Sequence, residues 1–506
     1  MKAMTLQSAF SSRIWLVPVA LIGFLLLSIF SFNPLAGVAV MMGLGLVAFS
    51  LQRSELATLA VIFAIYMNIP AVAVRYHHVP KIVGASLGLL LFIPLIDRLI
   101  VRGEKVICDR VFVLMLLYLL VMLTSTIFAR DFVLAARSMA DYAFEGLVLY
   151  FLISNVVRDL PTLKRVIGAM LLAGSLMGAL TIFQKATGTL NNDYGGFAQA
   201  GGVFAVGQSW GKLALQIRPN GPIGEQNRFG QLLIVLVPLA SLVVLRGKTF
   251  AARAGALTAG TLIVGGVVLT YSRGAFLGLI FMITLMVFMG YIKPSRAIPV
   301  GFIAVVAFLF TGPGFIKRLQ AFEQVPALLS GKSTTGQSPD ESMRRRLAEN
   351  LAALEVLADH PLVGVGPAHF ARFYSTAYVN RIGLAAQAKG YFAHNLYLEI
   401  AANTGLLGLA AFLIIVGVLM HELWSQWRRL RWSRPNAAYY SGAFFLSCAV
   451  YLMTGVFLQL AFQRYFWLLI AVASSAARAV AQDSAEPLPK EEDLSSSPEP
   501  LRTEPA

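Results

Sequence analysis

The stretch "YFAHNLYLEIAANTGLLG", residues 391–408, leads a polar pattern into an apolar run typical of a helix that crosses a membrane. If the stretch is helical, Asn395, Glu399 and Asn403 recur at every fourth position and form one polar stripe. His394 stands directly before this stripe. Polar and ionisable groups are costly at membrane depth, so their presence there indicates a functional site.

The rest of the chain is equally apolar. Of its 506 residues, 57% are hydrophobic and 13% are charged, and the mean hydropathy is +0.71. A soluble protein carries roughly a quarter charged residues, so this composition indicates an integral membrane protein. The two-residue alternation of a membrane barrel is absent, and backbone groups in lipid must bond within their own segment. We therefore predict an all-α polytopic fold.

Fourteen stretches are apolar enough to cross a membrane at or near the usual length of about 20 residues. Because several are short or contain glycine, we predict about 12–14 transmembrane helices. The first run, 14–30, has a basic flank without a small-residue cleavage site, which predicts an uncleaved anchor. The predicted spans centre near residues 22, 43, 64, 89, 120, 149, 175, 238, 262, 282, 305, 409, 449 and 471.

The distribution of Lys and Arg predicts a cytoplasmic N-terminus, since cytoplasmic loops carry an excess of both. The basic stretches "DRLIVRGEKVICDR" and "WRRLRWSRP" then lie in the cytoplasm. Two long segments, about 185–228 and 311–393, lie outside. Much of the net charge of +16 is therefore topological and does not indicate nucleic-acid binding.

The two outer segments differ in character. Segment 185–228 is rich in Gly and Asn, which predicts mostly loop. The other contains "DESMRRRLAENLAALEVLADHP", residues 340–361, which predicts a helix. Its apolar stripe would pack on the outer leaflet or on the spans, and a plain surface helix fits the pattern equally well. The stripe consists of Met343, Leu347, Leu351 and Leu354.

Two domains follow from this pattern. Residues 1–480 form the polytopic membrane domain, and residues 481–506 are rich in Pro, Ser and acids, which predicts a disordered cytoplasmic tail. Cys108 lies in a predicted cytoplasmic loop and Cys448 inside a predicted span, so no disulfide or metal framework is expected.

Cationic residues gather on the predicted outer face. Arg218 and Arg228 lie in "IRPNGPIGEQNRFG", Arg273 lies in "LTYSRGAFLG", and His394 completes the set. The donors of arginine suit phosphate oxygens, so two arginines near a histidine would suit a diphosphate leaving group beside a proton acceptor. Plainer interpretations stay open: Arg273 could snorkel to the headgroups, which composition alone favours. Arg228 could be an interfacial anchor, Arg218 a solvated loop residue and His394 a packed side chain.

Several common catalytic patterns are absent from the sequence. There is no Walker loop, GxSxG, HExxH or CxxC pair, and the outer face carries no acidic pair suited to a divalent ion. We therefore expect neither a metal nor a cofactor, with arginine supplying the charge that Mg²⁺ would otherwise provide. His77, His78 and His421 are expected to be ordinary surface or packed residues.

Three motifs in order carry a resemblance to a known family. The first is Arg218-x-x-Gly221 with Asn227, and the second is the Ser-Arg-Gly-Ala of "YSRGAFLGL". The third is "DHPLVGVGPAHF" followed by "AHNLYLEIAANTGLLGLAAF". With these motifs the chain, over about residues 110–475, resembles the O-antigen ligase and Wzy polymerase superfamily of bacterial membrane glycosyltransferases. The resemblance implies a GT-C-like helical fold in the bacterial inner membrane with its active site facing the periplasm.

The resemblance also implies substrates and residue roles. The donor would be a glycan on undecaprenyl diphosphate, and Arg218 and Arg273 would bind the diphosphate, with Arg228 as the alternative arginine of the first motif. His394 would help to deprotonate or position the acceptor hydroxyl. The expected supporting residues are Asn227, Asn395 and Glu399.

The resemblance leaves two acceptors open. A polymerase would transfer the growing chain to another lipid-linked repeat unit, and this is the activity that we expect. A ligase would transfer it to lipid A core or another acceptor. A polysaccharide flippase is the alternative from another class; it would carry internal repeats and charged or broken helices near the midplane.

Overall fold

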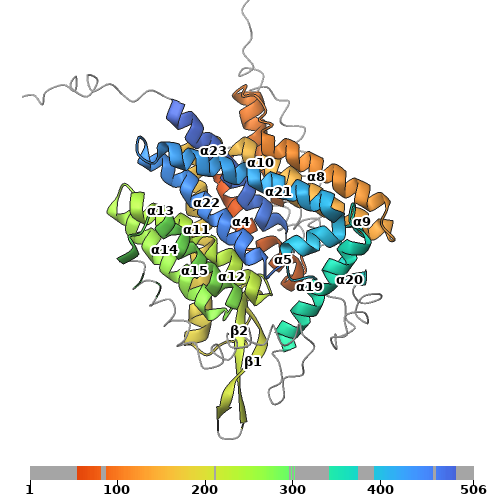
Figure 1. Ribbon diagram of the computed structural model, residues 1–506. Coiled ribbons are helices and arrows are strands. Elements are labelled where there is room, and N and C mark those ends of the chain that lie inside the picture. The colour runs from red at the N-terminus through yellow and green to blue at the C-terminus, as the bar shows by residue number, and fades with distance from the viewer. Residues whose placement is uncertain are drawn as a thin grey trace, which may run out of the picture.

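The computed structural model describes residues 54–80, 87–209, 212–295, 298, 301, 341–373, 392–459 and 463–485. Within these ranges the chain forms a bundle of helices with one two-stranded sheet (Figure 1). The expectation of an all-α polytopic membrane protein is thereby confirmed.

In the described ranges, seven helices are long and apolar enough to cross a membrane. The bent pair α4 (Ser54–Tyr66) and α5 (Ile69–Tyr76), with an angle of 58° between its halves, would make an eighth span. Each of the seven contains one predicted centre. They are α8 (Arg110–Ile127), α11 (Leu160–Ala186), α12 with α13 (Gln226–Ile234 and Val237–Arg246), α14 (Phe250–Leu269), α21 (Leu396–Leu430), α22 (Pro435–Gly455) and α23 (Gln463–Ala485).

The predicted spans near residues 89, 149 and 282 are interrupted or short. The first is divided into three five-residue pieces of different helix type, with Pro94, which has no backbone donor, in the middle piece. The second contains a π-helical turn, in which the hydrogen bonds span five residues. The predicted centres at 22, 43 and 305 and the anchor at 14–30 lie outside the described residues. The elements concerned are η2 (Leu87–Leu91), α7 (Phe92–Ile96), η3 (Asp97–Val101), α9 (Phe132–Tyr142), η4 (Ala143–Val148), α10 (Leu149–Val156) and α15 (Arg273–Phe288).

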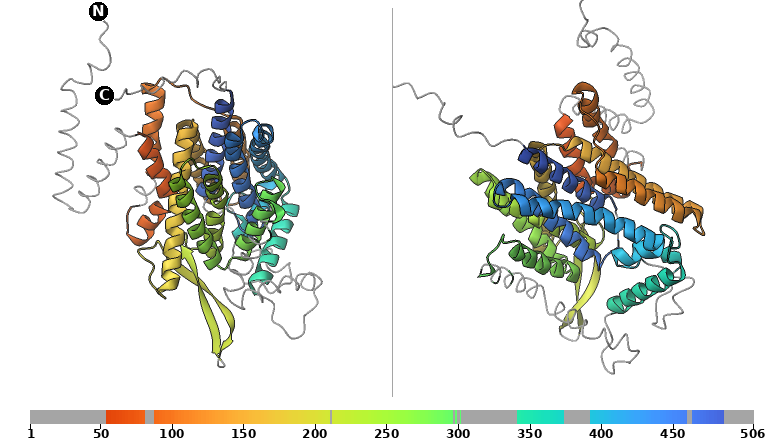
Figure 2. Two further views of the ribbon diagram at one scale, coloured as in Figure 1. Left: turned by 90° about the vertical axis from the view of Figure 1, so that its left-hand side faces the viewer. Right: turned by 45° about the horizontal axis from the view of Figure 1, so that its top comes forward.

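The bundle has two distinct ends. The sheet consists of β1 (Gln199–Ser209) and β2 (Lys212–Gly221), paired antiparallel, and it projects from one end, which we call the hairpin end (Figure 1, Figure 2). Helices α12, α15 and α21 begin at the hairpin end, whereas α8, α11, α14 and α22 begin at the opposite end. The alternation of direction is that of a chain that crosses a membrane repeatedly.

The opposite end is held by ion pairs and helix caps. Arg98 contacts Glu104 and Asp159, each at 3.2 Å, and Arg158 contacts Glu104 at 2.9 Å. Asp159 also caps α11, and Asp109 caps α8 while it contacts Arg478 of α23. These contacts join the starts of α8 and α11 to the end of α23.

The expectation that segment 185–228 is mostly loop is wrong for the hairpin. Its glycine content favoured loop, but "KLALQI" places Leu213, Leu215 and Ile217 at alternate positions, which is the two-residue period of a strand. The register pairs Arg218 with Gly201, near the base of the hairpin. The strand thereby delivers the first sequence motif to the end of the bundle.

Helix α19 (Glu341–Asp359) confirms the helix predicted within 340–361, and the exposure of Leu354 in its apolar stripe is compatible with the outer-leaflet and the plain-surface interpretations. Leu354 is 47% exposed. Helix α19 packs against α21 through small side chains, which allow closer helix contact than leucines would. The buried face consists of Ala348, Glu349, Ala352, Ala353 and Val356.

Helix α23 lies at the centre of the bundle, with Trp467 packed against Phe412 of α21. It runs to Ala485, so the predicted tail boundary at 481 is too early; "SSAARAVAQDSA" is rich in alanine, which favours helix. Residues 486–506 lie outside the described ranges. As expected, the two cysteines do not meet: Cys108 is exposed and Cys448 is buried in α22.

Candidate functional site

The start of α21 is held by a segment that crosses it. Residues 361–366 exchange backbone hydrogen bonds with residues 402–407, with N···O distances of 2.8 to 3.3 Å. At this crossing α21 is interrupted at Gly405, whose φ is 68° and ψ is −171°. A Cβ atom at Gly405 would lie 2.1 Å from the carbonyl oxygen of Leu362. The crossing therefore requires glycine, and it fixes the direction in which the chain enters α21.

The predicted polar stripe anchors this helix start. The Asn395 side chain caps α21 by accepting hydrogen bonds from the Tyr397 and Leu398 backbone amides. Two residues before the break, Asn403 Oδ1 accepts a hydrogen bond from the Phe370 amide at 2.9 Å. Between them Glu399 lies near enough to Arg228 for the two charges to interact.

His394 precedes the cap in a left-handed conformation, with φ at 49°. Its Nδ1 lies 2.7 Å from Glu349 Oε2 and 3.0 Å from the Phe392 carbonyl oxygen. The carboxylate and the carbonyl both accept hydrogen bonds, so a neutral His394 carries its proton on Nδ1. Nε2 then keeps its lone pair, and the ring is prepared to accept a proton.

Arg218 connects the first motif to the second. Its Nε donates to the Thr270 carbonyl oxygen at 2.8 Å, and its Nη2 donates to Asn227 Oδ1 at 3.0 Å. Thr270 ends α14, and Ser272 caps α15, of which Arg273 is the first residue. Arg218, Asn227 and Arg273, which the sequence analysis singled out separately, therefore belong to one place in the fold.

The Arg228 side chain contacts the loop after α22. It is 3% exposed, and its Nη1 donates to the Gln459 carbonyl oxygen at 3.1 Å. Glu225 caps α12 by accepting from the amides of Asn227 and Arg228. Arg228 thus joins the start of α12 to the loop after α22, on the inner side of the site.

Two functional candidates were missed by sequence reasoning, Arg346 and Glu349. Glu349 is fully buried on α19, and its Oε1 lies 3.7 Å from Arg345 Nε. Burial lowers the pKa of the half-buried Arg346 guanidinium; so does the charge of Arg273, whereas Glu225 and Glu349 raise it. The four-residue spacing of Arg345 and Glu349 in "MRRRLAEN" was the available signal, but it is common on surface helices.

These contacts define one site at the hairpin end, which we call the hairpin-end cluster. It gathers cations and one buried carboxylate around a histidine. Within the described ranges, no group of three His, Cys, Asp or Glu side chains is arranged to hold a metal ion. The cluster consists of Arg218, Arg273, Arg346, Glu349 and His394.

Another histidine of the motif region, His369, makes backbone contacts with both of its ring nitrogens. His369 is fully buried, its Nε2 accepts a hydrogen bond from the Asp131 amide at 3.1 Å, and its Nδ1 lies 2.9 Å from the Pro367 carbonyl oxygen. Both ring nitrogens are occupied by backbone groups, so His369 ties the crossing segment to the start of α9.

The fold and the site define a polytopic helical membrane protein with a cationic site and a histidine at one end. Residues 256–413 match the family model described as O-antigen ligase. This match supports the resemblance of the chain to the O-antigen ligase and Wzy polymerase superfamily. The match covers the second and third motifs, whereas Arg218 and Asn227 precede it. A comparison with curated proteins finds no match to the chain.

Proposed function

We propose that the chain transfers a glycan from undecaprenyl diphosphate to an acceptor hydroxyl at the hairpin end of the bundle. The match of residues 256–413 to the family model described as O-antigen ligase supports transfer of a lipid-linked glycan. The observation that carries the proposal is the 2.7 Å contact of His394 Nδ1 with the buried Glu349, next to the arginine pair Arg273 and Arg346. A base beside concentrated positive charge suits a hydroxyl nucleophile and a diphosphate leaving group.

In the proposed step, His394 Nε2 accepts the proton of the acceptor hydroxyl as its oxygen bonds to the anomeric carbon. The bond between that carbon and the diphosphate oxygen breaks, and its electron pair stays on the diphosphate. Direct displacement inverts the anomeric centre. General-base assistance contributes roughly 100- to 10,000-fold in rate, and Glu349 stabilises the imidazolium that forms.

Arg273 and Arg346 are the proposed contacts for the diphosphate. Both are half-buried, and the Arg273 charge lowers the pKa of Arg346, which marks a place that favours an anion. Arg218, which is 5% exposed, donates a hydrogen bond to the Thr270 carbonyl oxygen and so holds the turn before Arg273. Its positive charge would add to that of the pair. Together they would provide without a metal the charge that the leaving group requires.

The remaining candidates are proposed as positioning residues. Asn227 fixes the Arg218 guanidinium, and Asn395 fixes the start of α21 directly after His394. Arg228 and Glu399 are near enough to interact electrostatically, which would help to position α12 relative to α21.

The proposed orientation places the hairpin end in the periplasm and the bundle in the inner membrane. The opposite end carries Arg98, Arg102 and Arg158 near the starts of α8 and α11. The loop between α21 and α22 adds further arginines there. Cytoplasmic loops are rich in Lys and Arg, so this arrangement supports the orientation.

The proposed acceptor is another lipid-linked repeat unit, which would make the chain a polymerase. The length of the outer segment around 311–393 favours this choice. Ligation to lipid A core is the second candidate, since the matching family model is described as O-antigen ligase. A flippase is less well supported, because the hairpin-end cluster lies at one end of the bundle instead of near its midplane.

Gel analysis of envelope glycans from a deletion strain tests the proposal, with complementation by wild type or by His394→Ala. Loss of long chains with single repeats remaining identifies a polymerase, and long chains stranded on undecaprenyl diphosphate identify a ligase. Normal glycans in the deletion strain, or full rescue by a well-expressed His394→Ala protein, would contradict the proposed transfer.

A further inference from the structure

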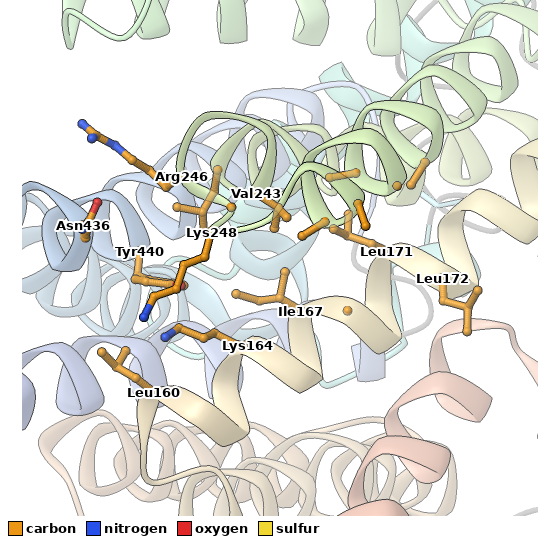
Figure 3. Close-up of a pocket in the computed structure, with 18 of the residues that line it drawn as sticks. Leu160, Lys164, Ile167, Leu171, Leu172, Val243, Arg246, Lys248, Asn436 and Tyr440 are labelled. Carbon is orange, nitrogen blue, oxygen red and sulfur yellow. The ribbon is translucent and has the colours of Figure 1, made fainter. Parts of the chain in front are cut away.

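A cavity of about 700 Å³ lies at the opposite end of the bundle from the hairpin-end cluster (Figure 3). Its walls come from α11, α13, α14 and α22, which all belong to membrane-length helices. The proposed glycan transfer makes no use of it. The side chains of its walls are mainly apolar and include Leu160, Ile167, Leu171, Leu172, Leu242 and Val243.

The mouth of this cavity carries two lysines, and Asp483 of α23 is an acidic residue in the same lining. Lys164 and Lys248 are both exposed, and their ammonium ends point to the same part of the cavity beside Tyr440 (Figure 3). Lys164 Nζ lies 5.9 Å from the centre of the Tyr440 ring. Arg246 points away and lies over Tyr439, with its guanidinium carbon 4.1 Å from the ring centre. Two lysines thus meet at the polar edge of an apolar groove.

Two glycines leave the groove open. A Cβ atom built on Gly168 of α11 or on Gly255 of α14 would meet no heavy atom within 4 Å. Both residues line the cavity. Glycine inside a helix costs about 1 kcal/mol relative to alanine, so neither position gains helix stability from it. What the two glycines provide is space along the wall.

We propose that this cavity binds an anionic phospholipid of the bilayer. Its phosphate would lie between Lys164 and Lys248, and an acyl chain would follow α11 past Gly168. The lined part of α11, Leu160 to Ser175, is about 22 Å long at 1.5 Å per residue. One leaflet contributes about half of the roughly 30 Å hydrocarbon core, so an acyl chain fits this length. Basic pockets between helices at the cytoplasmic side commonly hold such headgroups.

The first test measures lipid binding to the purified full chain by native mass spectrometry. Dioleoylphosphatidylglycerol is the probe, and dioleoylphosphatidylcholine is the neutral comparison. The double variant Lys164→Gln/Lys248→Gln should bind the anionic lipid roughly thirtyfold more weakly, because each lysine near a lipid phosphate contributes about fivefold. The control is Lys105→Gln/Lys293→Gln, which removes the same charge from exposed lysines outside the cavity and should bind like wild type.

The second test fills the groove and keeps its charge. Gly168→Leu and Gly255→Leu place side chains in the cavity without a clash against protein atoms, so the fold should be retained and the anionic lipid excluded. Gly417→Leu is the control, because its Cβ also meets nothing and it lies on α21, away from this cavity. Equal binding of the neutral lipid would overturn the proposal. So would undiminished phosphatidylglycerol binding in both sets of variants, or displacement of the lipid by inorganic phosphate alone.

Discussion

At residue 394 the backbone takes a conformation that side chains disfavour. The left-handed φ of 49° costs roughly 1–2 kcal/mol. A hydrogen bond to a charged group contributes about 1.5–3 kcal/mol, so the contact with Glu349 offsets this cost. The strain aims the imidazole at Glu349 and leaves Nε2 for the substrate. The proposed catalytic histidine and its carboxylate partner are therefore two residues, 45 positions apart, that only the fold brings together.

Two variants of Glu349 distinguish its role in positioning His394 from its role in stabilising the imidazolium charge. Glu349→Gln keeps an acceptor for His394 Nδ1 but loses the charge that stabilises the imidazolium, so kcat for glycan transfer should fall about tenfold with KM for the donor unchanged. Glu349→Leu removes the acceptor as well and should approach the loss in His394→Ala, about 100-fold or more. Steady-state kinetics on the purified proteins measure both. Equal rates for wild type and Glu349→Leu would contradict a positioning role.

The arginine pair Arg273 and Arg346 should stabilise the negative charge that develops on the diphosphate leaving group. Arg273→Gln and Arg346→Gln should each lower kcat/KM by about 100- to 1000-fold, as loss of one stabilising donor does at other charged transition states. Arg372→Gln is the control, because Arg372 is exposed on α20 (Phe370–Phe373) and pairs with Asp131 at 2.9 Å, outside the cluster. If the control loses as much activity as Arg346→Gln, a specific role for the pair is wrong.

Metal removal tests the same charge argument. Because three arginines converge on the proposed diphosphate site, transfer in excess EDTA should proceed at the rate of untreated enzyme. Activity of purified enzyme on a lipid-linked donor, with and without EDTA, gives the answer. A rate restored only by added Mg²⁺ would show that arginine does not replace the metal.

At the scale of the element, the break in α21 at Gly405 determines how the start of this helix is held. The glycine at the break has φ and ψ values that are essentially restricted to glycine, and the crossing segment takes over the backbone bonds that the helix gives up. The same segment leads through His369 to α9, and the part of α21 before the break begins at the Asn395 cap. One interruption thus sets the position of His394.

Gly405→Ala should disturb this arrangement. Its Cβ would lie 2.1 Å from the Leu362 carbonyl oxygen, so the crossing segment must move, and both thermal stability and transfer should fall. Gly417→Ala on the same helix meets open space and should be neutral or slightly stabilising, by up to about 1 kcal/mol. Thermal unfolding in detergent, beside the transfer assay, measures both effects. Wild-type stability in Gly405→Ala would show that the break is dispensable.

At the scale of the whole molecule, the two ends of the bundle carry different arrangements of charged residues. The hairpin end concentrates arginines around a histidine, whereas the opposite end ties arginines to acids and presents lysines at the cavity mouth. The hairpin end would face the periplasm and the opposite end the cytoplasm, which assigns glycan chemistry and lipid binding to different leaflets. Orientation is therefore the property that joins the two proposals.

The exposed Cys108 reports this orientation directly. It lies at the opposite end, so a membrane-impermeant maleimide should label it in inverted vesicles and not in spheroplasts, whereas the buried Cys448 should stay unlabelled in both. Asn191→Cys in a Cys108→Ser background places the thiol on an exposed residue near the hairpin and should show the opposite pattern. Labelling of Cys108 in intact spheroplasts would reverse the assigned topology.

The sequence was informative wherever periodicity or a motif acts locally. The apolar runs predicted each of the seven long helices, because a membrane requires every segment to satisfy its own backbone. The stripe of Asn395, Glu399 and Asn403 predicted a polar helix face. The sequence did not show the features that depend on packing: the buried face of α19 consists largely of alanines, and the glycine-rich segment 185–228 contains a hairpin.

The sequence by itself determined the membrane class, the helices and the three motifs, because hydrophobic length and residue type are local properties. Only the tertiary structure decided which arginines share a site with His394. Arg228 is adjacent to the first motif in sequence but points into the bundle, whereas Arg346, from a separate helix, lies beside Arg273. The reason is geometric: electrostatic partners are set by distance in space, and the packing of α19 on α21 fixes that distance.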